Sequence, residues 1–245
     1  MRIPTIQGVI DRRILINYQV DPAVLASILP PPFQPKVVNG VGIAGVCLIR
    51  LKDIRPHFIP TLMGISSENA AHRIAVQWKD KGVLHEGVYI PRRDTSSWFN
   101  TVVGRRLFPG LHHHAQFDIV ERENYFWVAL KSDDGETHLY VEARLSSELP
   151  ASSVFRSLQE ASQFFEAGSL GYSATSQPGK YDGLELRTLN WQVEPLAIDR
   201  VKSSFFENSK LFPSGSIKFD CALLMQGIQH EWHGQESLCL NNEKF

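Results

Sequence analysis

Alternation of apolar and polar residues with a two-residue period dominates the chain and predicts a mainly antiparallel β-fold. In residues 70–78 (AAHRIAVQW), even-numbered side chains form one face of a strand and odd-numbered side chains form the other. The turn KDKG at 79–82 and the extended pattern of 83–90 then predict a hairpin. The pair Asn39-Gly40, between two apolar runs, predicts another hairpin because it favours a tight two-residue turn.

The second half of the chain continues the same pattern. Three extended segments, 115–120, 125–131 and 137–145, are separated by short polar connections and predict a meander. Two long stretches rich in aromatic and β-branched residues follow at 184–198 and 216–232. We therefore expect most of the sheet to be built from neighbouring antiparallel strands.

Helices are predicted at three places. Residues 21–33 begin with Asp21 as a cap and end at three prolines. Residues 94–108 predict a helix capped by Asp94 or a nearby hydroxyl, and 152–168 carry a clear apolar stripe at helical spacing. No repeat or flexible linker interrupts the pattern, so we expect a single α+β domain over all 245 residues.

Composition narrows the classes of partner. Hydrophobic residues make up 43% of the chain and the formal net charge is −1, so neither nucleic acid nor an anionic membrane is indicated as a partner. No run approaches the roughly 18 apolar residues of a membrane span, and the start of the chain lacks a signal-peptide pattern. Three widely spaced cysteines, without a C-x-x-C pair, predict reduced thiols in a cytoplasmic protein.

The segment 103–117 (VGRRLFPGLHHHAQF) concentrates nitrogen-bearing side chains. If His112, His113 and His114 are extended, the first and third point to the same face and could supply two metal ligands. Two ligands do not define a metal site, and the competing interpretation is a polar turn with half-exposed imidazoles. We predict no metal and no cofactor, and we retain the three histidines as candidate proton donors and acceptors.

Arginines supply the candidate anion-binding groups. A guanidinium group suits a carboxylate or a phosphate, although an ordinary ion pair with a nearby acid is the commoner outcome. Glu68, at the entrance of a strand, is a further candidate acid or base, since burial would raise the pKa of its carboxyl group. The candidate ligand-binding residues are Arg73, Tyr89, Arg92, Arg93, Arg105 and Arg106.

Several segments in this order resemble the acetoacetate decarboxylase-like superfamily and, more closely, its uncharacterised DUF2071 branch. The resemblance runs over residues 8–235 and rests on the segments 14–33 (ILINYQVDPAVLASILPPPF), 68–76 (ENAAHRIAV) and 87–110 (GVYIPRRDTSSWFNTVVGRRLFPG). It implies a cone-like β-barrel with a few flanking helices and an internal pocket. It also implies a homo-oligomer, as in the related enzymes.

One departure from the superfamily bears on the chemistry. In the decarboxylases that this chain resembles, a lysine follows the Gly-Arg step and forms an imine with the substrate. Here Gly104 and Arg105 match that step, but no lysine lies between Lys81 and Lys131. Histidine cannot form this imine, and arginine stays protonated near neutral pH.

Three functions remain open at this point. The first is a pocket that binds a small organic acid, with a lyase, isomerase or hydratase step catalysed by the histidines and Glu68. The second is a non-catalytic ligand-binding or scaffold protein. The third is decarboxylation of the acetoacetate type, with a lysine supplied from elsewhere in the chain.

Overall fold

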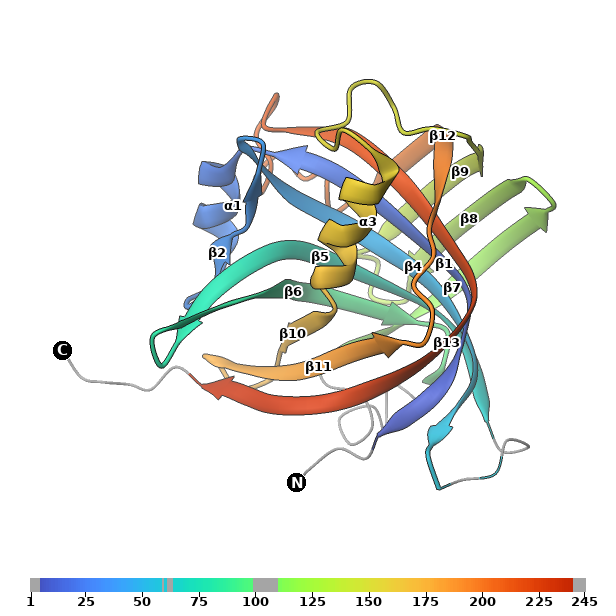
Figure 1. The fold of residues 1–245 in the computed structure, drawn as a ribbon, viewed down its shortest axis with the longest axis horizontal. Coiled ribbons are helices and arrows are strands. Elements are labelled where there is room, and N and C mark those ends of the chain that lie inside the picture. The colour runs from blue at the N-terminus through green and yellow to red at the C-terminus, as the bar shows by residue number, and fades with distance from the viewer. Residues whose placement is uncertain (1–4, 59, 61–63, 99–109, 240–245) are drawn as a thin grey trace.

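The computed structural model describes residues 5–58, 60, 64–98 and 110–239. Long curved strands dominate these residues, and two short helices accompany them (Figure 1). The helices are α1 (Pro22–Ile28) and α3 (Leu158–Ala167). The strands are β1 (Ile6–Val20), β2 (Gln34–Pro35), β3 (Val37–Val38), β4 (Val41–Pro56), β5 (Ile65–Asp80), β6 (Val83–Thr95), β7 (His112–Arg122), β8 (Tyr125–Ser132), β9 (His138–Leu145), β10 (Leu170–Ala174), β11 (Lys180–Thr188), β12 (Glu194–Ser203) and β13 (Ile217–Cys239).

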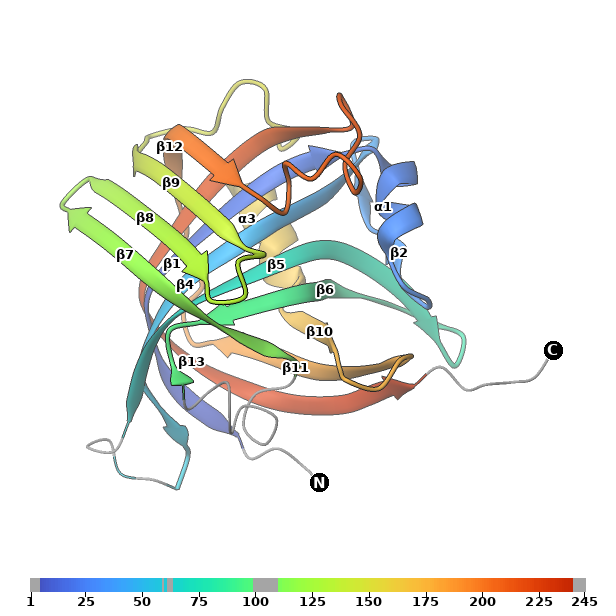
Figure 2. The same ribbon diagram turned by 180° about the vertical axis from the view of Figure 1, so that it is seen from behind.

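The sheet closes on itself to form two rings. The strand order β11-β10-β6-β7-β8-β9-β12-β13-β1-β4-β5 is joined by additional pairings between β11 and β13 and between β5 and β6. One ring therefore runs through β13, β1, β4, β5, β6, β10 and β11, and we call it the seven-strand ring. The other replaces β10 and β11 by β7, β8, β9 and β12, and we call it the nine-strand ring (Figure 2).

Each face of the shared strands contributes to a different core, because successive side chains in a strand point to opposite faces. In β5, Ala70, Ile74 and Val76 belong to the core of the nine-strand ring, which also takes Phe126 and Val141 from the meander. The opposite face contributes to a second core inside the seven-strand ring. Helix α3 lies against this face (Figure 1). The second core includes Leu15, Cys47, Ala75, Phe165 and Leu223.

The predicted hairpins and the meander are confirmed. Strands β3 and β4 meet at Asn39 and Gly40, which have φ values of 47° and 87°, as a tight turn of this type requires. Strands β5 and β6 meet at Lys81 and Gly82, and β7, β8 and β9 pair as consecutive antiparallel neighbours. The long stretch 184–198 is not one strand, since it is divided between β11 and β12.

The helices follow the predicted caps in part. Asp21 accepts a hydrogen bond from the Ala23 backbone N–H at 2.8 Å and begins α1, as predicted. Helix α3 begins later than expected, at Ser157, whose hydroxyl accepts from the Glu160 N–H. Asp94 lies buried within β6 and does not cap a helix, and most of the predicted helix at 94–108 lies outside the described residues. Within the described residues, no helix has the length and apolar character needed to cross a membrane.

The mainly antiparallel α+β fold is thus confirmed. Sequence alternation predicted the local pairing of strands, and the closure of the rings comes from pairings distant in sequence. Strand β13 pairs with β1, β11 and β12, so it is common to both rings.

Candidate functional site

The register between β1 and β4 brings the first two side chains of the candidate site together. Arg13 on β1 lies opposite Ile49 on β4, and Cys47 is two residues from Ile49 along the same strand. Since side chains two apart in a strand share a face, Arg13 and Cys47 both point into the seven-strand ring. The contact is direct: Arg13 Nε donates to Cys47 Sγ at 3.2 Å.

The next two strands extend this face. Cys47 lies opposite Ala71 on β5, and Ala71 lies opposite Arg93 on β6. Arg73 is two residues from Ala71 and therefore shares its face. Four adjacent strands thus place three guanidinium groups on one inner wall, and we call Arg13, Arg73 and Arg93 the arginine cluster.

Neutral partners surround the cluster. Arg13 Nη1 also approaches Met225 Sδ at 3.8 Å, and its guanidinium carbon lies 5.7 Å from the centre of the Trp191 ring. Arg93 Nε donates to Ser173 Oγ at 2.9 Å. These contacts position the side chains without neutralising their charge.

Arg73 is the most enclosed member of the cluster, with 7% of its surface exposed. It donates from Nη2 to Asn17 Oδ1, and its guanidinium carbon lies 4.9 Å from the centre of the Phe165 ring of α3. Gly45, the residue opposite Arg73 on β4, leaves space here: a Cβ at this position would lie 2.3 Å from the Ile16 carbonyl oxygen.

No carboxylate among the described residues forms an ion pair with the arginine cluster. Burial lowers the pKa of Arg73 to about 10, and the neighbouring Arg13 cation acts in the same direction. Burial likewise lowers the pKa of Arg93 to about 10. Both groups still carry a proton near neutral pH, so the wall holds excess positive charge in a poorly solvated place, where an anion would be stabilised.

His112 adjoins this wall. Strands β6 and β7 pair in parallel, and Arg93 lies opposite His112. Burial and, to a smaller extent, the Arg93 charge lower the pKa of His112 to about 3. The imidazole is therefore neutral beside the arginine cluster and can exchange a proton with a bound molecule.

The other two histidines of the run serve different contacts. His113 Nδ1 lies 2.9 Å from Asp134 Oδ2, and His114 Nδ1 lies 2.7 Å from Asp133 Oδ2. The ring of His114 also stacks on Trp98, with centroids 3.9 Å apart. These contacts join the start of β7 to the turn between β8 and β9.

Glu68 lies on the opposite face of β5 from the arginine cluster. It forms ion pairs with Arg12 and Arg50, and both arginines also pair with Glu121 of β7. Arg12 is 1% exposed, so this network is a buried connection between β1, β4, β5 and β7. The structure does not bring Glu68 together with His112.

The remaining predicted residues are placed as follows. Arg92 pairs with Asp94 at 2.7 Å, with Asp134 at 2.9 Å and with Glu136 at 3.3 Å, so acidic neighbours satisfy its charge. Tyr89 packs 5.4 Å from Phe33 and 6.0 Å from Tyr181 between ring centroids, on the face away from the arginine cluster. The predicted Arg105 and Arg106 lie outside the described residues.

Sequence reasoning missed Arg13, Asn17 and Cys47. A signal for Arg13 was present, since it begins the alternation Arg13, Leu15, Asn17 on the second face of a strand whose first face is apolar. Arg13 comes close to the residues of β6 only because β1, β4, β5 and β6 pair in this order. The periodicity of the sequence does not specify which strands pair.

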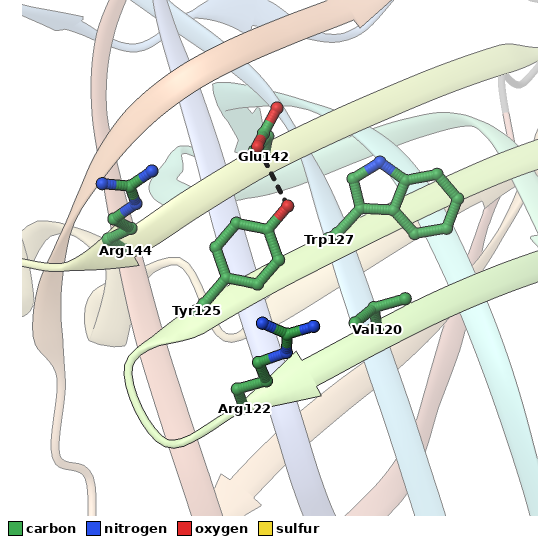
Figure 3. Close-up of a pocket in the computed structure, with 6 residues that line it drawn as sticks. All are labelled: Val120, Arg122, Tyr125, Trp127, Glu142 and Arg144. Atoms are coloured by element: carbon green, nitrogen blue, oxygen red, sulfur yellow. Dashed lines mark hydrogen bonds between the residues drawn. The ribbon is translucent and has the colours of Figure 1, made fainter.

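Two hollows on the described surface differ in their relation to the arginine cluster. One, of about 740 Å³, lies between α3 and β13 and is lined by Ser162, Gln192 and Met225, so it adjoins Arg13 through Met225. The other lies on the outer face of the meander (Figure 3), where Tyr125 Oη donates to Glu142 Oε1 at 2.9 Å. Glu142 accepts a second tyrosine hydroxyl, from Tyr140, so the carboxylate of the outer hollow is already engaged.

Metal binding and imine formation each require particular side chains: a group of ligands for the metal, and a buried lysine for the imine. In the part of the chain that the structure covers, no three His, Cys, Asp or Glu side chains form a group able to hold a metal ion. No lysine among those residues is buried. Lys36 pairs with Glu86 at 2.6 Å, Lys52 pairs with Asp11 at 2.8 Å, and Lys218 is exposed.

Comparison with solved structures relates the fold to known proteins. An acetoacetate decarboxylase from Legionella pneumophila superimposes with a TM-score of 0.61 at 14% identity, covering 95% of this chain and 87% of that chain. An acetoacetate decarboxylase-like enzyme from Sphingomonas wittichii RW1 gives 0.57 at 12% identity, covering 97% and 92%. The enduracididine biosynthesis enzyme MppR, complexed with pyruvate, gives 0.59 at 9% identity, covering 97% and 90%.

Comparison of the sequence gives the family. No curated protein matches the chain. The family model DUF2071, described as an uncharacterized conserved protein, matches residues 10–225. The chain therefore belongs to the DUF2071 family and has the acetoacetate decarboxylase-like fold.

Proposed function

We propose that the protein binds a small organic acid inside the seven-strand ring, with the arginine cluster as the anion-binding group. One observation carries the proposal: Arg13, Arg73 and Arg93 share an inner wall on which no described carboxylate pairs with them. Buried or partly buried cations without an acidic partner are costly, and a bound anion removes that cost.

The same wall supports a reaction on a carbonyl acid. A carboxylate held by Arg93 would lie beside His112, the residue opposite it on β7. The negative charge of the ligand would raise the pKa of this imidazole from its value of about 3, so the site becomes a better proton acceptor when it is filled. A lyase or isomerase step by proton transfer fits this arrangement, and the acetoacetate decarboxylase-like fold supports it by analogy.

An imine route is not part of the proposal. It needs an unprotonated amine next to the bound acid, and the described lysines lie at partly or fully exposed positions, some of them in ion pairs. Borohydride trapping in the presence of a keto acid tests this point, since a covalent adduct on a lysine would contradict it.

The binding proposal is tested by thermal-shift measurements with acetate, pyruvate, acetoacetate and longer oxo acids. At least one acid is expected to raise the melting temperature, and Arg93→Gln is expected to weaken its binding about tenfold or more, as loss of a charge-assisted contact does. Arg187→Gln is the matched control, because Arg187 is exposed and pairs with Glu185 on β11.

A panel in which no acid shifts the melting temperature, or in which Arg93→Gln binds every acid like the wild type, would refute the proposal. The alternative of non-catalytic binding is separated by following the bound acid by NMR. Turnover that falls in His112→Asn while binding persists supports catalysis. Binding without turnover in the wild type supports a ligand-binding protein.

A further inference from the structure

The number of charges on the arginine cluster exceeds what one carboxylate can neutralise. Three protonated guanidinium groups face the interior, whereas a simple oxo acid supplies one negative charge. We infer that the ligand is a short dicarboxylate, with one carboxylate held by Arg93 and the other by Arg13 and Arg73. This inference rests on the proposed function and specifies the class of acid.

The spacing of the arginines supports two anchoring points. Arg13 and Arg93 stand on strands separated by β4 and β5, which places their backbones about 14 Å apart along the curved wall. Arg73 is intermediate, on β5.

The N–H groups of the three arginines that have no strong acceptor in the part of the chain that the structure describes also fall at two ends, one at Arg93 and one at Arg13 and Arg73. Among the described residues, Arg93 donates only from Nε, to Ser173, which leaves both terminal nitrogens for a ligand carboxylate. Arg73 has a buried Nε without an acceptor in the structure. Arg13 uses Nε and Nη1 on sulfur atoms, which are weak acceptors, and keeps Nη2.

No nearby group among the described residues takes the place of the second carboxylate. Asp220, the buried carboxylate next to Cys221, is already engaged: it accepts from Gln19 Nε2 at 2.6 Å, from Ser153 Oγ at 3.0 Å and from the Val154 N–H at 2.8 Å. The imidazole of His112 is neutral. A monoanion would therefore leave about two charges of the cluster uncompensated, which is unfavourable in a buried place.

The inference is tested by isothermal titration of the full chain with two pairs of acids. 2-Oxoglutarate is compared with 2-oxopentanoate, and glutarate with pentanoate, since each pair differs only in the second carboxylate. Both dianions are expected to bind at least tenfold more tightly than their partners at the same ionic strength, because each adds a charge-assisted contact.

Variants then assign the two ends. Arg13→Gln is expected to abolish the preference for 2-oxoglutarate while it leaves the affinity for 2-oxopentanoate within about twofold. Arg93→Gln is expected to weaken both acids. Arg144→Gln, on the outer face of β9 in an ion pair with Asp199, is the control and is expected to change neither affinity.

Each outcome has a distinct meaning. Equal affinities for the two members of each pair would overturn the dicarboxylate inference and leave the proposed function intact. If Arg13→Gln and Arg73→Gln still bind the dicarboxylates more tightly than the monocarboxylates, the assignment of the second carboxylate to these two arginines is overturned. Absence of binding by every acid, with circular dichroism showing a folded protein, would overturn both the inference and the proposed function.

Discussion

At the scale of single residues, His72 is an unusual member of the nine-strand core. It has no exposed surface, and neither ring nitrogen has a hydrogen-bond partner among the described residues. Its imidazole packs 4.6 Å from the Phe205 ring and 5.7 Å from the Phe206 ring, between centroids. The side chain therefore fills an apolar space while it keeps two buried polar atoms unsatisfied, which is costly.

Replacing His72 by phenylalanine is expected to stabilise the protein. The substitution removes both unsatisfied nitrogens and keeps a planar ring against Phe205 and Phe206, so we expect a gain of about 1 kcal/mol in the free energy of unfolding at pH 7.5. Urea unfolding followed by circular dichroism measures it. His138→Phe, at an exposed position of β9, is the control. A loss of stability in His72→Phe would instead indicate a polar partner for the imidazole.

At the scale of elements, the segment before α3 depends on Asp220 of β13. The sequence predicts a helix from residue 152, but the helix begins at Ser157, and Val154 before it donates its N–H to the Asp220 carboxylate. Gln19 of β1 donates to the same carboxylate. One side chain therefore connects β1, β13 and the approach to α3.

Asp220→Ala is expected to be among the most destabilising substitutions outside the apolar cores. It removes the acceptor of three donors, one buried and two partly buried, so we expect a loss of about 3 kcal/mol. Asp199→Ala, which removes an exposed ion pair with Arg144, is the matched control and should cost less than about 1 kcal/mol. Chemical denaturation of both variants compares them, and similar losses would show that Asp220 does not secure α3.

Prediction from sequence succeeded for elements whose signals are local. The two-residue alternation at 70–78 correctly separated the faces that now hold His72 and Arg73, and the turn residues located the hairpins. It named Arg73 and Arg93 as candidates but neither Arg13 nor the meeting of the three, because Arg13 and Arg93 are brought together only through the pairings of β1, β4, β5 and β6. Nor could it distinguish a paired arginine such as Arg92 from an unpaired one, since the acids of Arg92 include Asp134 and Glu136 from another hairpin.

At the scale of the whole molecule, three buried or partly buried histidines among the described residues make stability dependent on pH. Burial lowers the pKa of His72 to about 3, of His112 to about 3 and of His230 to about 4. In the unfolded chain each titrates near 6.5. The unfolded state therefore binds more protons below this value, and the stability present above pH 6.5 is lost as the pH falls toward 4.

The expected size of this effect is about 2 kcal/mol for each histidine between pH 7 and pH 5, or about 6 kcal/mol for all three. Urea unfolding at several pH values measures it. His72→Phe and His230→Leu should each reduce the loss by about one third, and the exposed His138→Phe should not. Unchanged pH dependence in both buried variants would show that other groups take up the protons.

Because β13 belongs to both rings, neither ring can close before residues 217–239 have been synthesised. One of the two partners of β1 is β13, about two hundred residues later in the chain, where Leu224 lies opposite Ile14. Contacts so distant in sequence make folding slow. During translation, the wall that holds Arg13, Arg73 and Arg93 therefore stays open to water and to other chains until the last strand leaves the ribosome.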